Sequence, residues 1–286
     1  MPFPATSVPL GRALAERAYL EPTPVQTAVL ADEAQGRDLL VSAQTGSGKT
    51  VAYGLALAGT LLDEADALAP ARDPLALVIA PTRELALQVE AELAWLWQHA
   101  GGRVVACVGG MDPRREARRL AEGAHIVVGT PGRLRDHLER GALRLGSLAV
   151  AVLDEADEML DMGFREELEA ILDATPPERR TLLFSATLPR AIVGLARRYQ
   201  RDALRIEVAG TGEAGGHADI EYRAVRVAPR EREHAIVNLL RYFEAPGAIV
   251  FCNTRESVRH LQAILQERGF GAVALSGELS QSERNR

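Results

Sequence analysis

The sequence predicts an α/β fold, a parallel sheet flanked by helices that is followed by part of a second α/β unit. Three observations support this prediction. Short apolar runs alternate with amphipathic stretches, a polar or glycine-rich cluster follows each run directly, and a glycine-rich segment interrupts the pattern at 208–219. Aliphatic runs are typical of parallel strands covered on both faces. Strand–helix alternation favours right-handed crossovers into one parallel sheet.

Six apolar runs are the expected strands of the first unit. In chain order they are DLLVS (38–42), LALVIA (75–80), RVVACV (103–108), HIVVG (125–129), LAVAVLD (148–154) and TLLFS (181–185). Between them the apolar period changes to that of a helix. In 84–99, for example, Leu85, Val89, Leu93 and Leu96 recur at helical spacing. We therefore expect a helix between each pair of strands.

The chain divides into an N-terminal domain (1–208), a flexible linker (209–219) and part of a C-terminal domain (220–286). The segment VAGTGEAGGHAD (208–219) is rich in Gly and Ala and has no apolar period, which is typical of a linker. The runs IEYRAVRV (220–227), AIVFC (248–252) and GAVAL (271–275) then predict the beginning of a second α/β unit.

Composition narrows the class of protein. The 286 residues are 47% hydrophobic, enough for one or two cores, and the net charge of -6 argues against coating nucleic acid by charge alone. Cys107 and Cys252 lie in apolar runs, so we expect buried free thiols in a reducing compartment. The first residues lack the pattern of a signal peptide, and no stretch approaches a membrane span. We expect a cytoplasmic enzyme with no membrane partner.

The segment AQTGSGKT (43–50) predicts a phosphate-binding loop. It comprises Ala43, Gln44, Thr45, Gly46, Ser47, Gly48, Lys49 and Thr50, with Ala43 where the common pattern has Gly. Glycines let backbone N–H groups converge on phosphate oxygens, and the following helix N-terminus adds its dipole. Of 33 basic residues only Lys49 is a lysine. Its compact ammonium would reach the outer phosphates, which the planar fork of arginine does not replace.

A magnesium site is predicted from Thr50, whose hydroxyl would ligate the ion, and from Asp154, which would hold it through water. Asp154 and Glu155 end an apolar run, where nucleotide hydrolases place such a carboxylate. Glu155 would orient and deprotonate the attacking water. Alone, an Asp-Glu pair is more often a solvated helix start. The phosphate loop upstream favours the catalytic interpretation, with ATP and Mg²⁺ as cofactors.

The polar clusters all follow predicted strands, and ligands of open parallel sheets bind outside the carboxyl ends of the strands. AQTGSGKT, PTRELA, GG, TPGR, DEAD and SAT each come directly after a different apolar run. Ordinary strand-to-helix turns also favour such residues. Six of them at the same edge nevertheless predict one long composite site.

In their residues and their order these clusters resemble the motifs of the DEAD-box ATP-dependent RNA helicases of superfamily 2, which have two RecA-like domains. The resemblance rests on DEAD (154–157), SAT (185–187), PTRELA (81–86), GG (109–110), TPGR (130–133) and TPVQ (23–26), which is similar to the family's Q motif. It covers nearly the whole chain. It implies that Gln26 reads adenine, that Ser185 and Thr187 bond the DEAD segment and serve catalysis, and that Phe3 stacks on the base. A core anchor is the alternative for Phe3.

The resemblance also implies a path for RNA, held by its sugar-phosphate backbone as a single strand or short duplex without reading sequence. The implied residues of the first unit are Pro81, Thr82, Arg83, Gly109, Gly110, Thr130, Pro131, Gly132 and Arg133. In the second unit IVFCNTR (249–255) resembles a further family motif, and Thr254, Gly277 and Gln281 are RNA candidates. A helix cap is the alternative for Thr254.

The expected function is ATP-dependent local unwinding of RNA duplexes. An RNA clamp or assembly scaffold that uses ATP as a lock is the alternative, and a DNA translocase is a third. The family's last motifs, which include an arginine finger, are not found before Arg286. We therefore expect a chain truncated within the second domain, with poor hydrolysis and with self-association through the incomplete domain.

Overall fold

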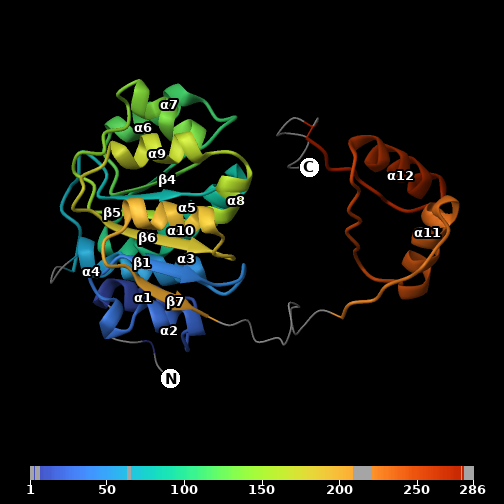
Figure 1. Ribbon diagram of the computed structural model, residues 1–286, viewed down its shortest axis with the longest axis horizontal. Helices are drawn as coiled ribbons and strands as arrows, with labels where there is room; N and C mark the ends of the chain where they lie inside the picture. Colours follow the sequence, from blue (N-terminus) through green and yellow to red (C-terminus); the bar gives the residue numbers. More distant parts are fainter. Residues whose placement is uncertain (1–2, 4–6, 63–65, 209–220, 278, 280–286) are drawn as a thin grey trace. The chain divides into compact units, whose positions relative to one another are not determined.

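Seven parallel strands form one sheet in the first part of the chain, as the computed structural model shows (Figure 1). The structure describes residues 3, 7–62, 66–208, 221–277 and 279, so the predicted linker lies outside the described residues. The chain separates into two units, Met1–Gly215 and Gly216–Arg286. The strand order is β3-β4-β2-β5-β6-β1-β7, and every neighbouring pair is parallel. The predicted parallel α/β fold is confirmed.

The six predicted strands are all present, mostly trimmed at their ends. They are β1 (Leu39–Ser42), β2 (Ala76–Ile79), β3 (Val104–Cys107), β4 (Ile126–Gly129), β5 (Val150–Leu153) and β6 (Arg180–Ser185). The seventh, β7 (Leu204–Glu207), escaped the sequence analysis. Its LRIE pattern alternates apolar with charged residues, because this edge strand pairs with β1 alone and buries only part of its surface.

Helices cover both faces of the sheet, and the alternation of strand residues divides the core between them. In β1, Leu39 and Val41 face one cluster whereas Leu40 faces the other. The first cluster holds residues of α1 (Val8–Glu16), α2 (Pro24–Val29), α3 (Lys49–Ala56), α4 (Ala58–Leu61) and α5 (Arg83–Leu96). The second holds residues of α6 (Pro113–Ala121), α7 (Pro131–Glu139), α8 (Ala156–Asp161), α9 (Arg165–Asp173) and α10 (Arg190–Tyr199).

The described residues of the second unit form a short 3-10 helix, η3 (Pro229–Glu231), and two α-helices, α11 (Arg232–Phe243) and α12 (Arg255–Glu267). The strands expected at 220–227, 248–252 and 271–275 are not formed in the described part of this unit, so that prediction is wrong there. Ile249 is 83% exposed and Phe251 91% exposed. Without a neighbouring strand their backbone groups gain no ladder hydrogen bonds, and an isolated strand is unstable in water. For the same reason Cys252 is partly exposed, not buried as predicted.

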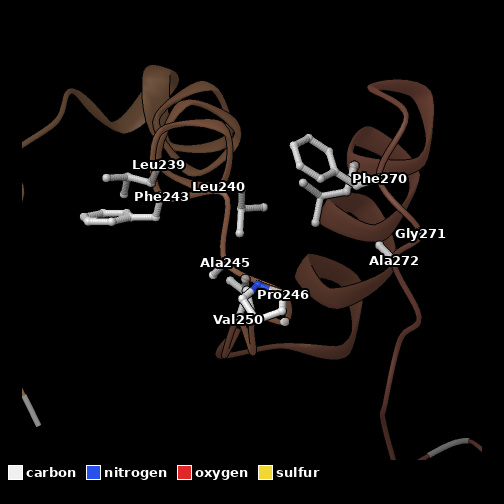
Figure 2. A pocket seen from close by; sticks show the side chains of 12 residues that line it. Leu239, Leu240, Phe243, Ala245, Pro246, Val250, Phe270, Gly271 and Ala272 are labelled. Carbon is white, nitrogen blue, oxygen red and sulfur yellow. The ribbon is translucent and has the colours of Figure 1, made fainter.

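An apolar pocket of about 480 Å³ lies between α11 and α12 (Figure 2). Leu240 and Phe270 contribute to its wall, together with Pro246 and Val250 from the segment that follows α11. Leu265, which also lines the pocket, forms a small buried cluster with Val237 and Leu261. This unit therefore has an apolar side that its described residues do not cover.

No helix of the described residues is both long enough and apolar enough to cross a bilayer.

Arg180 offers a test of how the sheet is anchored. Its side chain is 6% exposed and donates to three backbone carbonyls, those of Arg37 (2.6 Å), Ala56 (2.9 Å) and Ala34 (2.9 Å). Arg180→Met keeps the volume but leaves these acceptors unpaired. We expect it to lower the free energy of unfolding by about 3 kcal/mol in urea denaturation. Arg12→Met, which breaks only the exposed pair with Glu16, is the control and should change little.

Candidate functional site

The strand order divides the carboxyl edge of the sheet into two halves. Strands β5, β6 and β1 are neighbours, so the DEAD, SAT and phosphate-loop segments lie side by side. Strands β3, β4 and β2 are neighbours in the same way, which places GG, TPGR and PTRELA together. The β2–β5 pairing joins the halves. All six predicted clusters therefore lie along one edge.

The phosphate loop leaves β1 still attached to β6, because Ala43 N donates to Ser185 O at 3.0 Å. Gly46 and Gly48 have φ values of 82° and 87°, a left-handed backbone conformation that residues with a Cβ rarely adopt. Helix α3 begins immediately afterwards at Lys49. The Lys49 side chain is buried and its Nζ donates to Ala43 O at 3.3 Å. The Lys49 side chain therefore folds back onto the loop, and its ammonium lies where phosphate oxygens would be held.

Gln26 is fixed against this loop. It is 1% exposed, its Oε1 accepts from Thr23 N at 2.9 Å, and its Nε2 donates to Gly48 O at 3.2 Å. A Cβ at Gly48 would lie 2.6 Å from Gln26 Nε2, so only glycine permits this approach. The amide that was predicted to read adenine therefore supports the loop in this structure. Phe3 is partly buried and packs against the first core cluster.

The rest of the loop faces outward. Gln44, Thr45 and Gly46 are exposed, while Ser47 and Thr50 are half-buried. Thr45 Oγ1 donates to Glu155 Oε1 at 3.2 Å, which joins the loop directly to the carboxylate pair. Loop and DEAD segment thus contact each other although 110 residues separate the two side chains along the chain.

Asp154 carries the chemistry expected of a metal-holding carboxylate. It is 2% exposed, and its Oδ2 accepts from Tyr53 OH at 3.0 Å. Its buried Oδ1 has no hydrogen-bond partner among the described residues. Burial raises the pKa of Asp154 to about 6, although the Lys49 charge and the Tyr53 hydrogen bond both oppose the rise. An open, buried carboxylate oxygen beside an ammonium fits Mg²⁺ held through water.

Glu155 is in the left-handed region, with φ 50° and ψ 52°, at the residue that precedes α8. A residue with a Cβ pays a conformational cost there, and such strain often accompanies functional sites. The turn sends the chain from β5 into α8 and leaves the half-buried Glu155 carboxylate within reach of Thr45. Its position is compatible with a water-activating base.

The SAT and DEAD segments are joined through Asp157. Ser185 Oγ accepts from Asp157 N at 3.3 Å, and Asp157 Oδ2 accepts from both Thr187 N (2.9 Å) and Thr187 Oγ1 (2.7 Å). Burial alone would raise the pKa of Asp157, but these hydrogen bonds outweigh it and hold the pKa below its usual value. The structure therefore contains the bonds that were expected between Ser185, Thr187 and the DEAD segment.

In the other half of the edge, two helices begin at predicted RNA residues. Thr82 caps α5 by accepting from Leu85 N at 3.2 Å, and Thr130 precedes α7, whose first residue is Pro131. Gly109, Gly110 and Gly132 are exposed. Exposed backbone beside two helix N-termini is suited to phosphate groups.

The two predicted RNA arginines hold the GG loop. Arg83 Nη1 donates to Gly109 O at 3.3 Å, and Arg133 Nη1 donates to Met111 O at 3.2 Å. Arg133 also pairs with Glu116 at 2.7 Å. In this structure both guanidinium groups are therefore engaged with the protein, so the shape of the loop depends on them.

Glu116 is the centre of this arrangement. It is 4% exposed and accepts from Val108 N (3.0 Å) and Arg133 Nη1 (2.7 Å), and His137 Nε2 lies 2.7 Å from its Oε2. Burial would raise its pKa, but these partners hold the pKa below its usual value. Cys107 completes a group of buried ligand atoms within 4.8 Å of one another. Both carboxylate oxygens already bind protein donors, so we interpret the group as a structural network.

In the second unit Thr254 caps α12, accepting from Ser257 N at 3.1 Å, as the alternative interpretation held. Gly277 lies near Arg255, whose Nη2 is 3.5 Å from the position of a Cβ there. Gln281 is outside the described residues.

Sequence analysis missed Tyr53, Glu116 and His137. Tyr53 could have been found from its spacing, because it is one helical turn after Lys49 and therefore on the same side of α3. Glu116 stands alone among the arginines of PRREARRLA, which was a weak signal. His137 carried none.

Comparison with known proteins agrees with this geometry. The model of the DEAD/DEAH box helicase family matches residues 23–194. The chain belongs to the DEAD/DEAH box helicase family. It is 40% identical over 266 residues to the DEAD-box ATP-dependent RNA helicase CshA of Bacillus cereus, which covers 93% of this chain and 49% of that protein. It is 38% identical to the ATP-dependent RNA helicase DbpA of Bacillus subtilis, over 96% of this chain and 55% of that one.

A solved DEAD box protein has the same fold. The crystal structure of a DEAD box protein from the hyperthermophile Methanococcus jannaschii matches with a TM-score of 0.65 and 35% identity, covering 99% of this chain and 74% of that chain. The helicase-family chain therefore has the RecA-like sheet that was predicted, and it spans about half the length of the curated relatives it matches.

The raised pKa of Asp154 predicts a cost in stability. Because the folded pKa is about 6 and the unfolded value is near 4, ionisation of Asp154 opposes folding at any pH above 6. Without nucleotide or Mg²⁺, Asp154→Asn should raise the free energy of unfolding by about 3 kcal/mol at pH 8, because each pKa unit is worth about 1.4 kcal/mol. Urea denaturation should show the gain shrinking as the pH falls through 6 and vanishing near pH 4. An equal gain in the free energy of unfolding at pH 8 and at pH 4 would show that ionisation of Asp154 is not the cause.

The Glu116 network makes a second prediction. Glu116→Ala removes the carboxylate partner of the buried His137 and the half-buried Arg133, and should lower the free energy of unfolding by about 3 kcal/mol in urea. Glu90→Ala is the matched control, because it breaks the more exposed pair with Arg119 and should cost less than about 1 kcal/mol. Equal losses in the two variants would show that burial of the network is unimportant.

Proposed function

We propose that this chain binds ATP with Mg²⁺ at the β1, β5 and β6 ends. The observation that carries the proposal is the meeting of the phosphate loop with the carboxylate pair: Thr45 contacts Glu155, and Tyr53, one turn after Lys49, contacts Asp154. A loop with two left-handed glycines and a buried lysine is suited to the outer phosphates. Thr50 and the open oxygen of Asp154 would hold Mg²⁺ between them.

The proposed reaction is hydrolysis of the outer phosphate. Mg²⁺, when bound, neutralises charge on the phosphate oxygens, and Lys49 stabilises the charge that develops as the bond breaks. Glu155 orients a water molecule and takes its proton. Asp157, Ser185 and Thr187 would transmit the state of the nucleotide, because they bond the segment that follows Glu155 to the end of β6.

The RNA path is proposed along the β2, β3 and β4 ends. Backbone N–H groups near Thr82 and Thr130, with the exposed glycines Gly109 and Gly132, would contact the sugar-phosphate backbone of one strand. Contacts of this kind need little long-range positive charge, which is compatible with the net charge of -6. Thr254, Gly277 and Gln281 are proposed as further RNA contacts, which belong to the second unit.

The activity of the whole protein is proposed by analogy. CshA and DbpA are named ATP-dependent RNA helicases. We infer that this chain likewise couples ATP to local separation of RNA duplexes in the cytoplasm. An ATP-locked RNA clamp uses the same residues, and it would bind RNA in an ATP-dependent way without unwinding it.

Two variants test the assignment. Lys49→Ala should weaken ATP binding by at least about tenfold, because one strong ionic contact to phosphate is lost. Glu155→Gln should keep ATP affinity within about twofold but lower turnover by about a hundredfold or more, because only the base is removed. Calorimetric titration and phosphate release, with RNA and with DNA, are the measurements. Unchanged affinity in Lys49→Ala would refute the site, and stimulation by DNA alone would favour a translocase.

A further inference from the structure

Tyr53 is a fully buried polar residue in contact with Asp154. It lies in α3, the helix that directly follows the phosphate loop, and it is 0% exposed. Its ring packs edge-to-face on Phe184 of β6, with centroids 5.3 Å apart and an interplanar angle of 64°. Its hydroxyl donates to Asp154 Oδ2 at 3.0 Å. A single residue therefore connects α3, β6 and the end of β5.

Packing alone does not account for the hydroxyl. Phenylalanine would fill the space between α3 and Phe184 equally well, because the surrounding core is apolar. A buried hydroxyl without a partner is costly, so its presence here requires a polar neighbour. That neighbour is Asp154, the residue proposed to hold the metal ion.

The chemistry of the pair makes Tyr53 a constant donor. Burial raises the pKa of Tyr53 well above its usual value, the Asp154 charge adds to the rise, and a hydrogen bond with Thr50 opposes it. The Tyr53 hydroxyl is thus close to Asp154 and Thr50, the two residues proposed to hold Mg²⁺.

The two oxygens of Asp154 consequently have different roles. Oδ2 is occupied by the phenol, whereas the buried Oδ1 has no partner among the described residues. A carboxylate with both oxygens free could rotate about its terminal torsion, which has a broad energy well. A carboxylate held at one oxygen has one orientation and presents one oxygen.

We propose that Tyr53 is a positioning residue for the metal site, holding Oδ2 of Asp154 so that Oδ1 is the oxygen presented to Mg²⁺-bound water. This inference rests on the proposed ATP–Mg²⁺ site. Tyr53 is proposed to act through Asp154, whose Oδ2 accepts its hydroxyl. Preorganisation of this kind lowers the cost of ordering the site when the ligand arrives.

The test separates metal-dependent from metal-independent binding. The affinity of the chain for a non-hydrolysable ATP analogue is measured by calorimetry with Mg²⁺ and with EDTA, and the ratio of the two affinities is the Mg²⁺ gain. Tyr53→Phe should reduce this gain by about tenfold, the effect of one hydrogen bond to a charged group. It should leave the affinity in EDTA unchanged, and it should raise the Mg²⁺ concentration needed for half-saturation.

The chain offers a matched control. Tyr199 OH donates to Asp173 Oδ1 at 2.9 Å on α10, so Tyr199→Phe removes the same kind of bond at another carboxylate. It should leave the Mg²⁺ gain unaltered. In an Asp154→Asn background, Tyr53→Phe should have no further effect on the gain, because the residue through which it acts is already lost.

Each outcome is decisive. A reduced gain in Tyr53→Phe, with unchanged binding in EDTA and a normal gain in Tyr199→Phe, supports the inference. An unaltered gain in Tyr53→Phe overturns it while the ATP site stands. Equal losses with Mg²⁺ and with EDTA show a purely structural role and also overturn it. If the wild-type chain shows no Mg²⁺ gain, the proposed function fails and the inference fails with it.

Discussion

The position of β6 between β1 and β5 is the constraint on which the nucleotide half of the molecule depends. Parallel hydrogen bonding fixes β1 against β6 and β6 against β5, so the phosphate loop, SAT and DEAD segments leave the sheet at adjacent points. Ala43 continues the ladder past the end of β1. Arg180, at the other end of β6, binds three carbonyls of neighbouring segments. A shift of β6 by one residue would place Leu183 and Phe184 on the opposite faces of the sheet. It would also move the SAT segment out of register with the phosphate loop and the DEAD segment.

Burial gives this edge its chemistry and also costs stability. Asp154 is kept almost out of water, which raises its pKa to about 6, and the nearby lysine and Tyr53 offset only part of that cost. The same burial leaves one carboxylate oxygen open in a place where Mg²⁺ would be strongly held. Glu155 adds a backbone conformation that residues with a Cβ adopt at a cost. The site therefore combines a buried carboxylate with a strained backbone, and both destabilise the fold. Such features are common at functional sites.

The other half of the edge is organised by arginine contacts within the protein. The family resemblance implied Arg83 and Arg133 as RNA contacts, and they lie in the first turns of α5 and α7. In the structure both hold the loop at 109–111, and Glu116 anchors Arg133 from below. A loop shaped in this way presents backbone atoms, which suits contacts with a sugar-phosphate backbone that carry no sequence information. The half proposed for nucleotide presents a buried lysine and an open carboxylate oxygen, whereas the half proposed for RNA contains a loop whose shape is fixed by arginine contacts.

Local pattern was sufficient for the features that depend on neighbours in sequence. The six strands, the phosphate loop and the N-cap Thr254 follow from apolar period and turn chemistry, which a short stretch of sequence contains. Pairing between distant segments decided the rest. The charged alternation of β7 fits its place at the edge of the sheet beside β1, and the apolar runs 248–252 and 271–275 pair with no strand in the described part of the second unit. The meeting of Tyr53 with Asp154, 101 residues apart, and of Glu116 with His137 depends on strand order, because no local signal specifies which strands become neighbours.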